Sequence, residues 1–396
     1  MLSEVPEGWD KARIDAVLQR NTTSVSVTEL AAEGLVAHYS LPAFDANKKP
    51  VIESGSEIKS NKTAIDKDCL LFSKLNPRIP RVWRVRHFGE QKPVCSTEFW
   101  ALKPKTDEVS LSYAEYFLGW NGFLSHPSIK PASSTNSHQR VDRKAFDAFM
   151  LPLPPLNEQR RIAEILSSVD ASIQATQAVI EQAERVKRGL MEELLTGGLG
   201  SEAIERGEVP DGWQRTKQGS VATFFNGRAY KLKEWEKEGT PVIRLQNLTG
   251  SGKEYYYSTL ELPPHQYCDF GDLLFMWSAS FGAYIWQGGK AIYHYHIWKV
   301  EQDAAQMMRL FHYYLLQYYT DIWKQDAHGM AMLHLTKKGM EQLEITIPPL
   351  SQQEKIVQIL SDADDFIAQQ RANAEQKMKI KQGLMNELLT GKVRTV

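Results

Sequence analysis

The feature that most constrains the fold is an internal duplication. Residues 153–170, LPPLNEQRRIAEILSSVD, align without a gap with residues 347–364, IPPLSQQEKIVQILSDAD, and nine of these 18 positions are identical. The same offset of 194 places residues 189–197, GLMEELLTG, over residues 383–391, GLMNELLTG, with eight of nine positions identical. Agreement of this extent predicts one structural plan built twice along the chain.

Each repeat has the pattern of a long helix. A Pro-Pro pair fixes an extended approach, after which Asn157 or Ser351 is expected to act as N-cap, and Ser351 and Glu354 have the spacing of a capping box. Apolar residues then recur every three or four positions, as in a heptad seam: Ile162, Leu166, Val169, Ile173, Ile180 and Ala183 in the first copy, and Ile356, Leu360, Ala363, Ile367, Ala374 and Met378 in the second. Gly197 and Gly391 are stop signals, so each helix should cover about 40 residues, or about 60 Å.

A largely polar helix of this length needs a partner for its apolar stripe. The other copy is the obvious partner, and an antiparallel pair would place two globular domains at opposite ends. Simple dimerisation coils are the alternative. Thr176, Gln370 and Lys377 interrupt the seam, which disfavours a pure two-stranded coil and leaves surface for other helices.

The regions outside the helices predict two α+β domains with a common fold. VPEGW at residues 5–9 and VPDGW at residues 209–213 mark matching starts. The expected strands are residues 69–75, 240–248 and 271–280, and the expected helices are residues 112–120 and 307–319. The predicted order is a first globular domain over 1–152, a long helix over 153–197, a second globular domain over 198–346 and a second long helix over 347–396. The fold class is therefore α+β, with two similar domains of mixed β-sheet and helices separated by two long antiparallel helices in a coiled-coil-like spacer.

Composition narrows the class of protein. The net charge of −1 gives no general attraction to nucleic acid, so any contact with DNA must come from local basic patches or be shared with a partner. Cys69, Cys95 and Cys268 lie far apart and are expected to be buried thiols rather than a disulfide or zinc framework. The sequence starts without a basic head or apolar run and has no stretch long enough to span a membrane, so a cytoplasmic location is expected.

The first domain holds the sharpest local charge. Between Cys69 and Thr97 there are six Lys or Arg residues and one acid, Glu90. Phosphates would bind such a patch, and arginine can pair with guanine through two hydrogen bonds. The predicted DNA contacts here are Lys74, Asn76, Arg78, Arg81, Arg84 and Arg86, together with Arg143. The alternative is a solvated strand face whose arginine stems cover Trp83.

The second domain offers candidates with weaker signals. Gln and Asn suit adenine edges, and basic residues flanked by glycine suit close approach to phosphate. The predicted contacts are Arg228, Arg244, Gln246, Asn247, Lys253, His328 and Lys337, with His334 nearby. Each could instead be a satisfied structural polar group.

No motif for catalysis is evident. The run from Gly250 to Glu254 lacks the first glycine and the Ser or Thr of a phosphate-binding loop, and there is no methyl-donor fingerprint or Asn-Pro-Pro-Tyr type tetrapeptide. His294 and His296 have no ligand partners at metal spacing, and alternating strand aromatics explain them better than a metal site.

The helical repeats resemble those of the specificity subunits of type I restriction-modification systems. LPPLNEQRRIAEIL with LMEELLTG, and IPPLSQQEKIVQIL with LMNELLTG, look like that family's central and C-terminal helical regions, and TPVIRLQNL, GDLLF and LLFSKLNPRIPRVWRV look like parts of its recognition domains. One departure is that Arg160 and Glu354 differ at matched positions.

The resemblance implies a non-catalytic DNA-reading subunit. Each domain would read one half of a bipartite double-stranded target, and the helices would bind two modification subunits. Residues at the repeats assigned to subunit binding are Glu158, Gln159, Leu190, Leu194, Gln353, Leu384 and Leu388. No cofactor or metal is expected in this chain, whereas S-adenosylmethionine, magnesium and ATP are expected on the modification and restriction subunits. The alternatives are an orphan DNA-binding scaffold or regulator, and an enzyme with an unfamiliar site.

Overall fold

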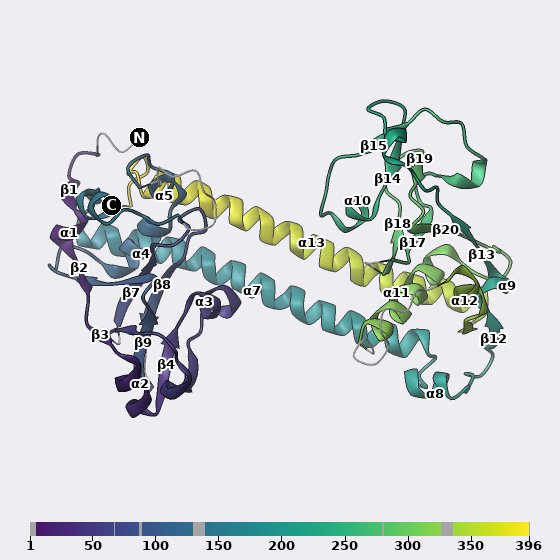
Figure 1. The fold of residues 1–396 in the computed structure, drawn as a ribbon, viewed down its shortest axis with the longest axis horizontal. Coiled ribbons are helices and arrows are strands. Elements are labelled where there is room, and N and C mark those ends of the chain that lie inside the picture. The colour runs from purple at the N-terminus through teal and green to yellow at the C-terminus, as the bar shows by residue number, and fades with distance from the viewer. Residues whose placement is uncertain are drawn as a thin grey trace. The chain divides into compact units, whose positions relative to one another are not determined.

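The computed structural model describes residues 5–66, 68–86, 89–129, 139–278, 281–325 and 336–395. The chain forms two compact units, residues 1–177 with 372–396, and residues 178–371. Two long helices, α7 (Leu156–Leu195) and α13 (Leu350–Leu388), each contribute one half to each unit (Figure 1). The predicted helices of about 40 residues are thus confirmed.

Both ends of the long helices follow from local chemistry, but the predicted N-caps were wrong. Asn157 and Ser351 lie inside the first turn. The proline before each helix supplies the first accepting carbonyl instead, because the N–H of Gln159 donates to Pro155 O and that of Gln353 to Pro349 O. Beyond the C-termini, Gly197 and Gly391 have φ of 59° and 71°, a conformation that glycine adopts without strain.

The first unit contains two larger sheets and a two-stranded one. The four-stranded sheet has the order β2-β10-β7-β8, and the five-stranded sheet has the order β3-β6-β9-β4-β5 with β4 and β9 parallel. The strands are β1 (Asp10–Arg13), β2 (Leu18–Asn21), β3 (Ser24–Val25), β4 (Leu35–Tyr39), β5 (Val51–Ser54), β6 (Lys62–Ala64), β7 (Asp68–Ser73), β8 (Val82–Arg86), β9 (Lys92–Ser96), β10 (Phe99–Pro104) and β11 (Met150–Leu153). The short helices are α1 (Ile14–Val17), α2 (Val27–Glu33), α3 (Leu41–Asn47), η1 (Gly55–Glu57), α4 (Leu111–Gly119), α5 (Asn121–Leu124) and α6 (Arg143–Ala148). Strand β1 pairs with β11, which leads directly into α7.

The second unit repeats this plan. Its main sheet has the order β13-β20-β17-β18, and the other four-stranded sheet has the order β15-β14-β19-β16 with β14 and β19 parallel. The strands are β12 (Gln214–Lys217), β13 (Ala222–Asn226), β14 (Thr240–Ile243), β15 (Tyr256–Ser258), β16 (Tyr267–Cys268), β17 (Leu273–Met276), β18 (Gly282–Ile285), β19 (Ala291–Tyr293), β20 (Ile297–Gln302) and β21 (Glu344–Ile347). The helices are α8 (Ser201–Glu205), α9 (Gln218–Val221), η2 (Leu232–Glu234), α10 (Leu245–Thr249), η3 (Pro264–Gln266), α11 (Arg309–Gln325) and α12 (Lys337–Gln342). Strand β12 pairs with β21, which leads into α13.

The predicted correspondence between the two domains is confirmed. Strands β7 and β17 occupy the same place in their sheets, and α4 and α11 are the predicted counterpart helices. The strand predicted over residues 240–248 was wrong in its second half, because β14 ends at Ile243 and α10 begins at Leu245. Asn247 turns the chain there, since its Oδ1 accepts the backbone N–H of Arg244 at 2.9 Å.

Each globular domain packs on both long helices. In the first unit, Ile162 and Leu166 of α7 share a core with Leu388 and Leu389, at the end of and just beyond α13. In the second unit, Met191 of α7 shares a core with Ile356 and Leu360 of α13. The apolar stripe is therefore covered by the domain as well as by the partner helix. The three cysteines are buried and free, as predicted.

The two helices run antiparallel in both units. In the first unit Lys381 pairs with Asp170, and Lys377 Nζ donates to Thr176 Oγ1 at 2.7 Å. In the second unit Lys187 pairs with Asp364 and Arg371 pairs with Glu184. In each unit, residues with increasing numbers along α7 pair with residues of decreasing number along α13, which is the pattern of antiparallel helices. Two of the polar residues that interrupt the seam, Thr176 and Lys377, are thus joined to each other by a hydrogen bond.

Candidate DNA and subunit interfaces

A tyrosine, an aspartate and a lysine join each domain to both long helices, a set named here the tyrosine–aspartate–lysine bridge. In the first unit Tyr116 on α4 donates to Asp170 Oδ2 at 3.0 Å, and Lys381 Nζ lies 2.6 Å from Asp170 Oδ1 and 5.5 Å from the Tyr116 ring. Burial, together with the Asp170 charge, raises the pKa of Tyr116, so the phenol stays a donor. The bridge therefore locks a domain helix, α7 and α13 in one register.

The second unit contains the same bridge. Tyr314 on α11 donates to Asp364 Oδ2 at 2.9 Å, and Lys187 Nζ lies 2.6 Å from Asp364 Oδ1 and 5.4 Å from the Tyr314 ring. The two aspartates and the two lysines are each 194 residues apart, which is the offset of the sequence repeat. The duplication therefore extends to an individual electrostatic contact.

A buried glutamine at the start of each long helix forms a second repeated contact. Gln159 Oε1 accepts the Ser110 N–H at 2.8 Å, and its Nε2 donates to Glu108 O and Pro154 O. Gln353 makes the corresponding three bonds to Met308 N, Gln306 O and Pro348 O. Both side chains are fully buried, so all their polar atoms hold the domain on the helix.

The VPxGW and LLTG motifs meet in both units, which explains why each occurs twice. A Cβ added to Gly391 would lie 2.3 Å from Pro6 and 3.2 Å from Trp9. The equivalent atom on Gly197 would lie 2.7 Å from Pro210 and 3.3 Å from Trp213. Each glycine is thus required for close packing as well as for its positive φ. In the first unit the LLTG segment comes from the far end of the chain.

Glu158 anchors the C-terminal segment in the first unit. It is 3% exposed and accepts hydrogen bonds from Trp9 Nε1 at 3.0 Å, Arg394 Nε at 2.8 Å, Arg394 Nη2 at 2.9 Å and Thr395 N at 3.2 Å. Burial alone would raise the pKa of Glu158, but the hydrogen bonds from Arg394, Thr395 and Trp9 lower it overall.

These contacts change the interpretation of the residues assigned to subunit binding. Glu158, Gln159 and Gln353 are buried and occupied inside the chain, and Leu388 is in the core. Leu190, Leu194 and Leu384 are half-buried against the cores. The polar members therefore have an intramolecular role, and contact of any of the seven with another subunit stays a prediction.

The basic patch of the first domain is partly neutralised by distant acids. Arg81 forms two hydrogen bonds with Asp45, at 2.7 and 2.8 Å, and Arg84 forms two with Asp68, both 2.9 Å. Arg86 is exposed, and its side chain makes no ion pair or hydrogen bond with the described residues. The remaining candidates are spread over the loop before β8 and the start of α6: Lys74, Asn76, Arg78 and Arg143, the last lying 3.8 Å from Asp147.

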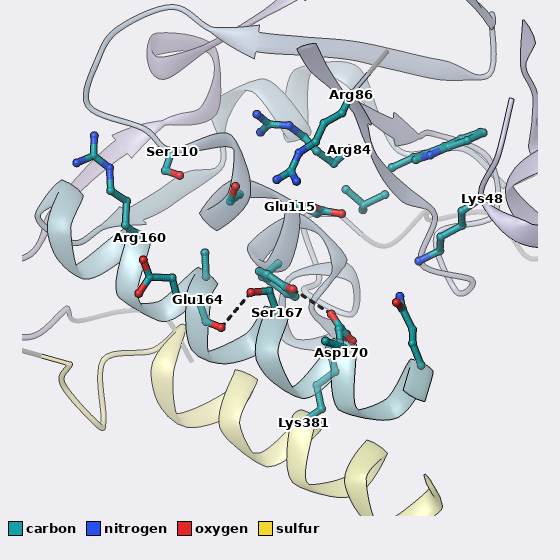
Figure 2. A pocket seen from close by; sticks show the side chains of 17 residues that line it. Lys48, Arg84, Arg86, Ser110, Glu115, Arg160, Glu164, Ser167, Asp170 and Lys381 are labelled. Atoms are coloured by element: carbon teal, nitrogen blue, oxygen red, sulfur yellow. Dashed lines mark hydrogen bonds and ion pairs between the residues drawn. The ribbon is translucent and has the colours of Figure 1, made fainter. Parts of the chain in front are cut away.

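Two arginines of this patch, Arg84 and Arg86, line a cleft of about 700 Å³ in the first unit. It lies between β8, α4 and α7, and Figure 2 shows Arg84 and Arg86 beside Glu115, with Arg160 and Asp170 on the helix opposite. Burial raises the pKa of Glu115, although Arg84, Lys48 and Arg86 oppose the shift. Arg84 and Arg86 therefore border a concave, mixed-charge surface rather than a flat basic face.

In the second domain two of the candidates, Arg228 and Arg244, lie over aromatic rings. Arg228 lies over Tyr230 at 4.5 Å and donates to Glu234, and Arg244 lies over Tyr256 at 4.7 Å and Trp235 at 5.7 Å. Lys253 is exposed in the loop after α10. Lys337, on α12, pairs with Glu341, and His328 and His334 lie outside the described residues.

The aromatic residues of this cluster were missed by the sequence reasoning. Tyr230, Trp235 and Tyr256 come from three separate segments, so only the density of aromatics between residues 224 and 257 could have signalled them. His294 joins the cluster 6.2 Å from Trp235. His294 forms an isolated β-bridge with Arg228 between β19 and β20, whereas His296 lies in the turn before β20, so the explanation of the pair as strand residues was wrong for His296.

The described residues also lack the features of a metal centre and of a membrane span. They contain no cluster of three or more His, Cys, Asp or Glu residues suited to a metal ion. In the same part of the chain, no helix combines the length and the apolar content that a membrane span requires.

Comparison with known proteins agrees with this architecture. The family model for the type I restriction modification DNA specificity domain matches residues 6–185 and 210–377. The MjaVIII specificity subunit of Methanocaldococcus jannaschii is 24% identical over 98% of this chain and 94% of its own, and the putative MjaX specificity subunit of the same organism is 26% identical over 99% and 95%. A solved chain of a type I restriction-modification system has a similar fold, with a TM-score of 0.63 and 17% identity, covering 98% of this chain and 100% of that one.

Two specificity domains that together span most of the sequence define the class: the chain belongs to the type I restriction modification DNA specificity family. It is a specificity subunit with two recognition domains of the same fold. The predictions of the family, of the fold class and of a specificity subunit with two recognition domains are confirmed.

Proposed function

We propose that this chain is the non-catalytic DNA reader of a complex that methylates adenine and cleaves DNA. Each recognition domain reads one half of a bipartite double-stranded target, and α7 and α13 set the distance between the halves and dock two modification subunits. Those subunits would carry S-adenosylmethionine, and restriction subunits would supply ATP- and magnesium-dependent translocation and cleavage. The complex would work in the cytoplasm.

The observation that carries this proposal is the repeated bridge of Tyr116, Asp170 and Lys381 with its copy. It builds the same junction between a domain and two antiparallel helices twice in one chain. Recognition modules that bind one side of B-DNA need half-sites about 34–36 Å apart, or a multiple of that distance. A helix rises about 1.5 Å per residue, so helices of 40 and 39 residues are long enough to impose such a spacing.

A methyl-transfer assay with the purified chain tests whether catalysis belongs to the modification subunit and DNA recognition to this chain. The chain with DNA and labelled S-adenosylmethionine is expected to give no incorporation, and the modification subunit alone is expected to give none at specific sites. The two together should label adenines at one defined sequence. Incorporation by the chain alone would contradict the proposal, because it would place a catalytic site here.

A further inference from the structure

The second recognition domain holds one arginine over two aromatic rings, an arrangement named here the Arg244 clamp. The Arg244 guanidinium carbon lies 4.7 Å from the Tyr256 ring centre and 5.7 Å from that of Trp235, and these two rings are 4.7 Å apart. Tyr230 extends the stack, at 4.7 Å and 21° from Trp235. Stacking on rings restricts a guanidinium to a few orientations and is favourable in itself.

Arg244 is held in place without a carboxylate. Its Nη2 donates to Gln246 Oε1 at 2.6 Å, and its backbone N–H is bound by Asn247. Among the described residues no acid lies within ion-pair distance of Arg244, and its Nε and Nη1 have no acceptor. The side chain therefore has no acidic partner among the described residues and retains at least two unused donors.

Other arginines of the chain show the difference. Arg20 also lies over a ring, that of Trp100, but both of its terminal nitrogens donate to Asp147. Arg228 lies over Tyr230 and is tied to Glu234 at 2.7 Å. The guanidinium groups of Arg20 and Arg228 are bound to carboxylates within the chain. The Arg244 guanidinium is held by the two rings and Gln246, and its remaining N–H groups are available as donors.

The surroundings of Arg244 suit a base edge better than a phosphate. Tyr256 is 42% exposed and Gln246 is half-buried beside the guanidinium. Burial, with a contribution from His296 and Arg244, lowers the pKa of His294 to about 4, so this imidazole is neutral at neutral pH. The clamp thus combines one fixed charge with neutral hydrogen-bonding and apolar groups, whereas phosphate sites favour several cations.

We infer that Arg244 reads a guanine in the half-site of the second domain, through its free donors and the N7 and O6 acceptors of the major groove. Trp235 and Tyr256 are positioning residues that hold the guanidinium for that contact. Asn247 is not a reader, because its amide nitrogen is used by Gly252 O and Glu254 O and its oxygen by Arg244 N. The inference rests on the proposed function and assigns one base of the target to one side chain.

Base frequencies at methylated sites test the inference. The chain and its variants are expressed with modification subunits, and the methylated motif is mapped. Arg244→Ala should leave one guanine of one half unspecified, with the other half and the spacer unchanged. Arg244→Lys keeps the charge but loses the planar fork, so it should relax the same position. Binding of the purified complex to oligonucleotides altered at that base should show a roughly 10- to 100-fold loss of discrimination.

Two further variants separate reading from folding. Tyr256→Ala should relax the same guanine, an effect that general destabilisation cannot confine to one base. Arg206→Ala removes an exposed arginine paired with Glu208 and should leave the motif unchanged. Three results would overturn the inference. The methylated motif of Arg244→Ala could be unchanged, its DNA binding could be weakened equally at every base position, or the half-site of the second domain could contain no guanine. Equal weakening with a smaller salt dependence would indicate a phosphate contact instead. If the wild-type chain adds no motif, the proposed function itself fails.

Discussion

Seven residues inserted into both long helices, after Gln177 and after Arg371, should lengthen the unspecified spacer of the DNA target by about three base pairs. Seven helical residues add about 10.5 Å, and one base pair occupies about 3.4 Å. A heptad keeps the apolar seam in phase. Both insertion points lie between the two bridges, so the Asp170–Lys381 and Lys187–Asp364 pairs can re-form. Sequencing of methylated adenines would measure the new spacer.

A longer insertion sharpens this test. Three base pairs also turn the duplex by roughly 100°, whereas 21 added residues give about nine base pairs, close to one full turn. The 21-residue variant should therefore retain more activity than the seven-residue one. A heptad placed in α7 alone is the control, because it shifts one helix against the other and should abolish methylation. A spacer that keeps its length in the paired insertions would show that the helices do not set it.

Replacing Glu158 by Ala should destabilise the first unit by about 2–3 kcal/mol. The change leaves the charge of Arg394 and the indole N–H of Trp9 without their acceptor. Removing the buried acid of an ion pair costs about 2–3 kcal/mol when, as here, the arginine is partly exposed. Because the pKa of Glu158 is lowered in the folded protein, its stabilisation is present above its ordinary pKa of 4.5 and is lost as the pH falls through the folded value. Urea unfolding at neutral and acidic pH measures both effects.

Glu164→Ala is the matched control for this substitution. Glu164 is on the same helix but pairs with Arg161 at the surface, where both side chains are more than 60% exposed. Its loss should change stability by no more than about 0.5 kcal/mol. Equal stability of the two variants would contradict the anchoring role of Glu158. Loss of modification-subunit binding by a fully stable Glu158→Ala protein would instead restore the interface prediction.

The duplication predicted the fold well because helical periodicity is a local property. The seam residues from Ile162 to Ile180, the stop glycines and the counterpart strands could be recognised without any long-range contact. The prediction of Met378 as a seam residue was wrong, because its side chain is 48% exposed. The N-caps were wrong for a local reason, since the prolines before Leu156 and Leu350 already supply the first accepting carbonyls. The helical turn at Arg244 was missed because the side chain of Asn247 overrides the strand pattern of residues 240–248.

The sites were harder to predict because they depend on partners distant in sequence. Arg394 meets Glu158 across 236 positions, and no pattern marks that pair. A local count of charge could not show that Arg81 faces Asp45. Gln159 and Gln353 were assigned to an interface with other subunits, whereas both hold a junction inside the chain that the repeat builds twice.

Genome-wide mapping of methylated adenines, in cells with the modification subunit and either with or without this chain, tests the central claim most directly. We expect a motif of two specified halves separated by a constant number of unspecified base pairs, present only when the chain is expressed. The same methylated sites in both cultures, or a motif that is continuous rather than divided, would contradict the claim.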